Sequence, residues 1–113
     1  MDLADKDLSR VTTALAGSLG DVLGRLRATD AHRLAGFDQR TPRVARLVGE
    51  AMRALGWERE RCRFDGVITY AFVRGSYLER EAVIDVDRGE GDVLVVRRRA
   101  PGSQSEQVAR REP

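Results

Sequence analysis

Residues 41–74, TPRVARLVGEAMRALGWERERCRFDGVITYAFVR, decide the fold. The stretch opens with Thr41, a residue type that caps helix N-termini, and Pro42, which is favoured as the first helical residue. Apolar residues then recur at helical spacing until Gly56, which can adopt the left-handed backbone that ends many helices. The pattern predicts a helix over residues 41–55, with arginines on the face opposite its apolar stripe.

A β-hairpin is predicted directly after this helix. Asp65 and Gly66 form a strong tight-turn signal between two β-prone runs. A two-residue loop pairs Phe64 with Val67, and each earlier residue with a later one in turn. Because opposed residues share a face of the sheet, apolar side chains fall on both faces. Either the hairpin is buried on both sides at its base, or a bulge shifts its register.

The part of the chain before residue 41 predicts two shorter helices. Ser18 and Asp21 have the spacing of a capping box and indicate a helix near residues 18–27. The apolar face of this helix would consist of Leu19, Val22, Leu23 and Leu26. A second short helix is expected near residues 30–35.

The two ends of the chain extend this unit. Residues 1–17 are expected to form an N-terminal helical extension with an apolar stripe of Leu3, Leu8, Val11 and Leu15. This stripe suits either packing onto the chain's own core or pairing with its copy in a homodimer. Residues 75–99 predict a second β-hairpin, and residues 100–113 are polar and aperiodic, which indicates a disordered tail. The predicted fold is α+β: a winged helix-turn-helix of three helices and a β-hairpin wing over residues 18–74, with an additional C-terminal β-hairpin.

Composition excludes several classes of protein. A length of 113 residues suits one domain, and no run of about 18 apolar residues suits a membrane span. The N-terminus is polar and acidic, unlike a secretory signal. Cys62 is the only cysteine, so neither an intrachain disulfide nor a cysteine-based zinc site is expected. A reducing cytoplasm is the expected compartment.

The positive charge is concentrated in one segment. The whole chain carries a formal charge of +2, whereas residues 40–63 contain seven arginines and three glutamates, a local balance of +4. Phosphate neutralisation needs such clustering, and arginine makes forked contacts with phosphate and guanine. The alternative without a binding partner is a solvated helix face on which Glu50 pairs with Arg46 and Arg53. The predicted nucleic-acid contacts are Arg40, Arg43, Arg46 and Arg53 on the helix, and Arg61 and Arg63 on the hairpin.

Other polar residues give no comparable signal. The acidic cluster in the second hairpin, Asp85, Asp87, Glu90 and Asp92, lacks the ligand spacing of a calcium loop, and a polar hairpin loop explains it. His32 has no companion ligand, and no grouping of serine, histidine and acid can be assembled around it. The sequence therefore predicts no catalytic residue, no metal ligand and no cofactor, and we do not expect an enzyme.

The order of features over about residues 18–74 resembles the winged-helix segment at the C-terminal end of virulence-associated E type helicase-primases of phages and mobile elements. The most specific block is MRALGWER, residues 52–59, and the other matching residues are Gln39, Arg40, Val44, Leu47, Arg61, Arg63, Asp65, Gly66 and Tyr70. This sequence has neither the ATPase nor the primase part of that family, and residues 75–113 follow where the family segment stops. The resemblance implies a nucleic-acid-facing winged helix in a phage-like or mobile-element setting, without either enzymatic activity.

Two functions agree with these patterns. The first is a small DNA-binding protein, a regulator or replication accessory, whose helix at residues 41–55 enters the major groove of double-stranded DNA. The second is a protein-interaction module on the same scaffold, such as an inhibitor of a host defence nuclease. In that case the second hairpin would offer a strand edge to a protein partner.

Overall fold

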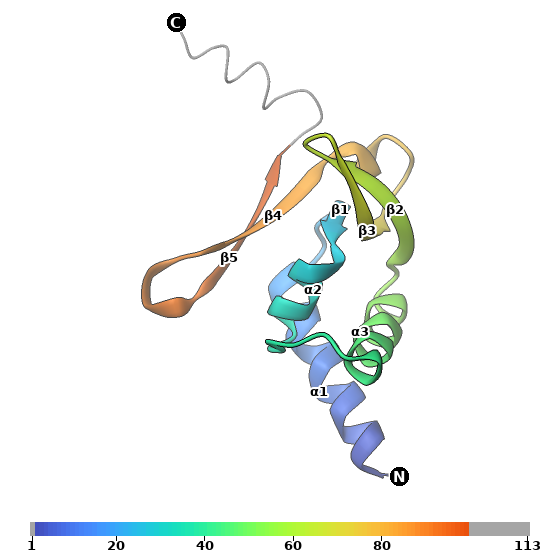
Figure 1. Ribbon diagram of the computed structural model, residues 1–113, viewed down its shortest axis with the longest axis vertical. Helices are drawn as coiled ribbons and strands as arrows, with labels where there is room; N and C mark the ends of the chain where they lie inside the picture. The colour runs from blue at the N-terminus through green and yellow to red at the C-terminus, as the bar shows by residue number, and fades with distance from the viewer. Residues whose placement is uncertain (1, 100–113) are drawn as a thin grey trace, which may run out of the picture.

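The computed structural model describes residues 2–99, and the tail expected over residues 100–113 lies outside the described residues. The described part contains three α-helices and one five-stranded mixed sheet, so the α+β class is confirmed (Figure 1). The helices are α1 (Asp2–Leu19), α2 (Ala28–Leu34) and α3 (Pro42–Ala54). The strands are β1 (Gly24–Arg27), β2 (Glu58–Phe64), β3 (Val67–Arg74), β4 (Val83–Arg88) and β5 (Leu94–Arg99). Two short 3-10 helices, η1 (Glu79–Glu81) and η2 (Glu90–Asp92), precede and follow β4.

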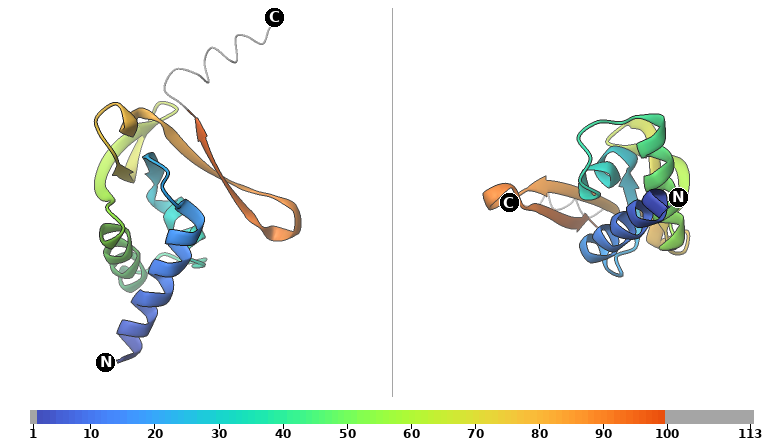
Figure 2. Two further views of the ribbon diagram at one scale, coloured as in Figure 1. Left: turned by 180° about the vertical axis from the view of Figure 1, so that it is seen from behind. Right: turned by 90° about the horizontal axis from the view of Figure 1, so that it is seen from below.

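The sheet has the strand order β2-β3-β1-β4-β5. Its central strand, β1, pairs antiparallel with β3 and parallel with β4, while the other neighbours form antiparallel hairpins. The helices gather at one end of the sheet, and Figure 2 shows that the β4–β5 hairpin projects away from them as an arm. One short strand therefore joins two hairpins into a single sheet.

The prediction of a helix near residues 18–27 is wrong. Helix α1 continues to residue 19, ends at Gly20, whose φ is +53°, and the chain then enters β1. Gly17 lies inside α1 because burial of the helix's apolar stripe outweighs the roughly 1 kcal/mol that a helical glycine costs. Leu26 is fully buried, but as a strand residue between β3 and β4. The short helix predicted near residues 30–35 is α2.

The apolar stripe of α1 packs inside the protomer. Val11, Leu15 and Leu19 are at most 4% exposed, and α1 contacts both α2 and α3. Leu8 packs at the edge of the same core, whereas the side chain of Leu3 lies outside the described ones. Of the two alternatives for this stripe, the structure shows packing onto the chain's own core, with α1 crossing the expected boundary at residue 17.

Helix α3 begins and ends as predicted. At its start, the hydroxyl oxygen of Thr41 accepts a hydrogen bond from the amide of Val44 at 3.2 Å. At its end, Gly56 has a φ of +92°, and the amide of Trp57 donates to the carbonyl of Met52 at 3.0 Å. This is the hydrogen bond that closes a Schellman motif, so local capping defines both ends of the helix.

The β2–β3 hairpin has the predicted register, with Phe64 opposite Val67. Its base is buried on both faces. Phe72 joins the main core beside the helices, and on the opposite face Cys62, Phe64, Ala71 and Val73 form a second cluster. Burial on both sides, rather than a bulge, therefore explains why apolar residues occupy both faces. The second predicted hairpin is formed by β4 and β5.

Arg74, the last residue of β3, joins the ends of three elements. Its guanidinium donates to the carbonyls of Gly20 and Val22, each at 2.7 Å, and of Leu55 at 2.9 Å. Its Cζ also lies 4.5 Å from the centroid of the Trp57 ring, which is 1% exposed. These carbonyls belong to the turn after α1 and to the C-terminus of α3, where the helix dipole favours a cation. The contact holds the helices against the end of the sheet.

Replacing Arg74 by lysine should destabilise the fold although the charge is kept. A single ammonium cannot reach three carbonyls and stack on an indole at once. We expect Arg74→Lys to lower the free energy of unfolding by about 2 kcal/mol, measured by urea unfolding. The control is Arg10→Lys on α1, where the side chain is 78% exposed, and the change should stay below about 0.5 kcal/mol. Equal stability of the two variants would contradict the role given to Arg74.

Candidate functional site

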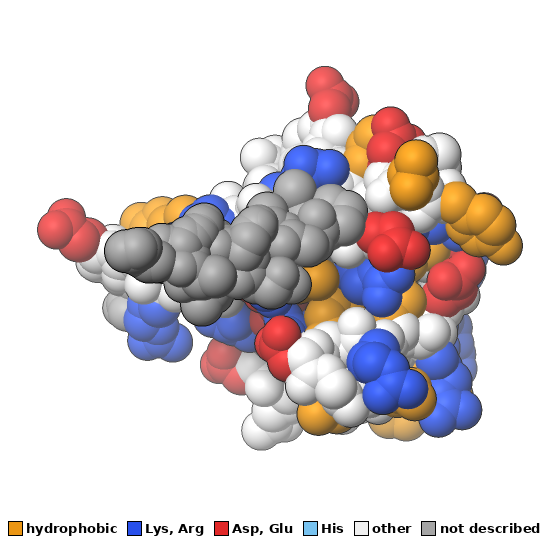
Figure 3. All heavy atoms as spheres, turned by 90° about the horizontal axis from the view of Figure 1, so that it is seen from above, with side chains coloured by type: hydrophobic (Ala, Val, Ile, Leu, Met, Phe, Trp, Pro, Cys, Tyr) orange, Lys and Arg blue, Asp and Glu red, His pale blue; other side chains and the backbone are white. Residues whose placement is uncertain are grey.

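Most arginines of the described residues fall into two sets by what their guanidinium groups contact. The first set is bound within the fold: Arg27, Arg33, Arg80, Arg97 and Arg99 pair with carboxylates, and Arg25, Arg74 and Arg98 donate to backbone carbonyls. On the face seen in Figure 3, acidic and basic side chains are interspersed, as such pairing produces. These arginines hold strands, turns and helices together.

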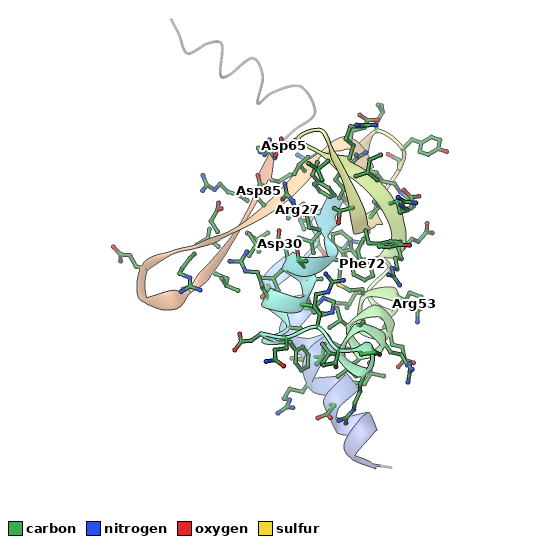
Figure 4. All side chains as sticks on the ribbon, in the orientation of Figure 1. Arg27, Asp30, Arg53, Asp65, Phe72 and Asp85 are labelled. Atoms are coloured by element: carbon green, nitrogen blue, oxygen red, sulfur yellow. The ribbon has the colours of Figure 1, made fainter. Side chains whose placement is uncertain are left out.

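The densest group of ion pairs lies where β1, β4, β5 and the tip of the β2–β3 hairpin meet (Figure 4). Asp85 of β4 accepts a hydrogen bond from Arg99 at 2.5 Å and lies 3.2 Å from Arg27. Arg27 also lies 3.8 Å from Asp30 and 3.5 Å from Asp65. Burial by itself raises the pKa of Asp85, but hydrogen bonds from the two arginines outweigh it and hold that pKa below its ordinary value. This group fixes the arm to the rest of the molecule.

The pleat of β2 separates acidic from basic side chains, because successive residues of a strand point to opposite faces. Glu58 and Glu60 lie on one face, where each is 3.3 Å from a guanidinium nitrogen of Arg80. The other face carries Arg59, Arg61 and Arg63. The glutamates are thus neutralised on their own side, and the arginines on the opposite side keep their positive charge.

The second set of arginines surrounds a pocket between α2, α3 and the β2–β3 hairpin. Its volume is about 330 Å³, in the range of small-ligand sites. The arginines that line it are Arg40, Arg46, Arg53 and Arg59. Within the described part of the chain, none of these four forms an ion pair with a carboxylate. Their charge is therefore open to an external anion.

The pocket is hollow because two of the α3 residues that line it are small. Ala45 and Gly49 line it about one helical turn apart. On the other side Phe72, which is 3% exposed, points from the sheet toward α3, the helix that carries Arg53 (Figure 4). Larger side chains at the two α3 positions would fill the space between helix and hairpin.

His32 of α2 also lines the pocket and is only 5% exposed. Its Nδ1 lies 2.8 Å from the carbonyl oxygen of Ala28, one turn earlier on the same helix. Its Nε2 is buried and has no hydrogen-bond partner among the described residues. The wall of the pocket therefore includes a residue whose buried Nε2 lacks a partner among the described residues, beside the positive charge of the arginines.

Four of the six predicted contact residues lie on this surface. Arg40, Arg46 and Arg53 line the pocket, and Arg61 follows Arg59 on the same face of β2. The guanidinium carbons of Arg59 and Arg61 lie 4.4 and 5.8 Å from the centroid of the Tyr70 ring. Cation–π contacts thus hold the two β2 arginines side by side. We use "the arginine surface" for Arg40, Arg46, Arg53, Arg59 and Arg61.

The other two predicted contacts lie apart from the pocket. Arg43 is directed toward α1, where its Nη2 is 3.6 Å from Asp7. Arg63 lies nearer the hairpin tip and donates to the carbonyl of Gly66 at 3.4 Å. A solvated helix face without a partner would have Glu50 paired with neighbouring arginines. These pairs do not form in the described structure.

Sequence reasoning missed two residues of the site. Arg59 had a usable signal: the predicted hairpin register places it on the same face as Arg61, two residues away. His32 had no such signal, because its burial depends on how α2 packs against α3 and the sheet. Two of the acidic residues weighed as a cation site are bound to arginines instead: Asp85 to Arg99, and Asp87 to Arg97 at 2.8 Å.

Among residues 2–99, no three His, Cys, Asp or Glu side chains that the structure describes are grouped closely enough to hold a metal ion. None of the helices in this range has both the length and the apolar character that a membrane crossing needs. The chain matches no family model, no curated protein and no solved structure. The candidate site therefore rests on the geometry of the pocket and of the arginine surface.

Asp85→Asn should lower the free energy of unfolding by about 1–2 kcal/mol at neutral pH, because it weakens the bonds to two arginines. The pKa of Asp85 in the folded state lies below the unfolded value of about 3.9. Its contribution is therefore complete above the unfolded pKa and is lost as pH falls through the folded pKa. Urea unfolding over an acidic pH series should show a shallower loss for the variant than for the wild type.

The matched control on the same strand is Asp87→Asn. Its ion pair with Arg97 is exposed, with 50% and 69% of the two side chains accessible. The expected change is below about 0.5 kcal/mol at every pH. A larger effect at residue 87 than at residue 85 would contradict the assignment.

Proposed function

We propose that the chain is a winged helix-turn-helix protein that binds double-stranded DNA through α3 and the β2–β3 hairpin. The order of elements supports this: a helix, a strand, two helices and a hairpin whose second strand pairs with the first strand. In this proposal α3 is the recognition helix, the hairpin is the wing, and β4–β5 is an addition to the sheet. The chain would act without a catalytic step or cofactor, as a small regulator or replication accessory of a phage or mobile element.

The observation that carries the proposal is the arginine surface itself. Like charges held close together repel one another, and none of these arginines forms an ion pair with a carboxylate of the described residues. A polyanion relieves the repulsion, and each phosphate that an arginine neutralises releases condensed counterions. The remaining arginines of the fold are largely paired, so the positive charge available to a partner is concentrated on one side of α3 and β2.

The spacing of these arginines also suits a duplex. Arg46 and Arg53 are seven residues apart, two turns of α3, and project about 10 Å from each other along the same side of the helix. Such a row can follow a major groove, where arginine reads guanine and binds phosphate. Arg59 and Arg61 would contact the DNA backbone from the hairpin, held in place by Tyr70.

A protein-interaction function is the second candidate, and exposed apolar side chains favour it. Tyr77 and Leu78, before η1, are 88% and 78% exposed, and Val93 and Val95 on the arm are 61% and 42% exposed. In addition, β5 lies at the edge of the sheet. An exposed strand edge beside apolar side chains can accept a strand of a partner. In this proposal the chain binds a protein, such as a host defence nuclease that it inhibits.

The combined change of Arg46→Glu and Arg53→Glu should abolish duplex binding while the protein stays folded. Both side chains are exposed, so the helical circular dichroism signal and the melting temperature should change little. Binding would be measured by fluorescence anisotropy with a labelled duplex at two salt concentrations. Neutralising either arginine singly to glutamine should reduce the salt slope by about one.

The matched control is Arg10→Glu combined with Arg97→Glu. It makes the same change in net charge at two exposed arginines outside the arginine surface. This control should retain most of the duplex affinity. An equal loss in both double variants would assign binding to net charge rather than to the surface. If the wild type does not bind duplex even at low salt, the protein-interaction function becomes the better proposal.

A further inference from the structure

One residue that lines the pocket, His32, has a hydrogen-bond acceptor that the fold leaves unused. Nδ1 of His32 bonds to the carbonyl oxygen of Ala28, and a carbonyl oxygen can only accept. Nδ1 therefore carries the hydrogen, and in this tautomer Nε2 is an acceptor. This atom is buried and has no partner among the described residues, although His32 lines the pocket.

A buried polar atom without a partner is costly and uncommon in native proteins, so its presence points to a partner that enters the pocket. That partner must offer an N–H or O–H donor to Nε2. Because four arginines surround the pocket, the partner must also carry negative charge. The pocket volume of about 330 Å³ leaves room for a group of several rings and a phosphate rather than for a bare ion.

We propose that the pocket binds a single unpaired nucleotide of a DNA strand, an inference that rests on the proposed DNA binding. Its phosphate would lie among Arg40, Arg46, Arg53 and Arg59, and an N–H of its base would donate to Nε2 of His32. Each base has an N–H donor on its Watson–Crick edge, and proteins read extruded bases through this edge. Within a duplex the opposite base uses the Watson–Crick hydrogens, and the amino hydrogens that remain lie inside a groove. An unpaired nucleotide can instead bring its base N–H into the pocket.

The walls of the pocket also suit a base. Ala45 and Gly49 leave space beside α3, and planar guanidinium groups stack on bases. The same arginines belong to the arginine surface, so a nucleotide could enter the pocket while its neighbours stay bound to that surface. The unpaired nucleotide can come from a strand end or from a mismatch.

The test compares three labelled duplexes of one sequence: blunt, with a single-stranded overhang, and with an internal mismatch. Wild-type protein should bind the overhang or the mismatch about tenfold more tightly than the blunt duplex, which is the effect of one well-placed hydrogen bond. The better of the two identifies the source of the nucleotide. His32→Asn keeps a donor for the Ala28 carbonyl but removes Nε2, and it should reduce the ratio to about one. His32→Gln places an amide oxygen near the position of Nε2 and should keep part of the preference.

A second variant tests the same inference if circular dichroism shows that His32→Asn does not fold. Ala45→Phe, at an exposed position of α3, fills the pocket without altering the histidine and should also reduce the ratio to about one. Equal binding of all three duplexes by the wild type would overturn this inference and leave duplex binding in place. A preference that survives Ala45→Phe would overturn it as well, because the nucleotide would then bind elsewhere. If the wild type binds none of the duplexes, the proposed function fails, and this inference fails with it.

Discussion

The contact of Arg74 with three backbone carbonyls and the Trp57 ring is the interaction on which the rest of the structure depends. Carbonyls at helix ends lack partners within the helix and must find donors elsewhere. One planar guanidinium meets this need for α3 and for the turn after α1, and it does so from the end of β3. The hairpin is thereby fixed relative to α3. Because the pocket lies between these two elements, its shape follows from this contact.

The distribution of charge follows from pairing rather than from the number of arginines. Most arginines of the described residues hold carboxylates or carbonyls, and the pleat of β2 sends its glutamates to the face that Arg80 neutralises. What remains is a surface across α3 and β2 whose arginines form no ion pair with the carboxylates of the described residues. An arginine-rich composition would not distinguish such a surface from a network of ion pairs, but the positions of the carboxylates do.

The arginine surface and the pocket would contribute differently to recognition. Exposed arginines bind phosphates of any sequence, which supports affinity and makes it depend on salt. In the proposed recognition Nε2 of His32 would discriminate between ligands, since a ligand without the matching donor would leave this buried atom without a partner. The two properties lie side by side because α2 brings the histidine to the edge of the surface that α3 and β2 provide.

The sequence by itself determined the elements whose signals are local. The ends of α3 depend on Thr41 and Gly56, and the register of the first hairpin depends on its two-residue turn; both agree with the structure. Only the tertiary structure decided that residues 24–27 form a strand, because Leu26 becomes buried between β3 and β4. The same holds for the direction of Arg43 toward α1. A helical preference is worth up to about 1 kcal/mol per residue, whereas burying a leucine is worth roughly 1.5–3 kcal/mol. Where the two conflict, partners distant in the chain decide, and a local pattern cannot reveal them.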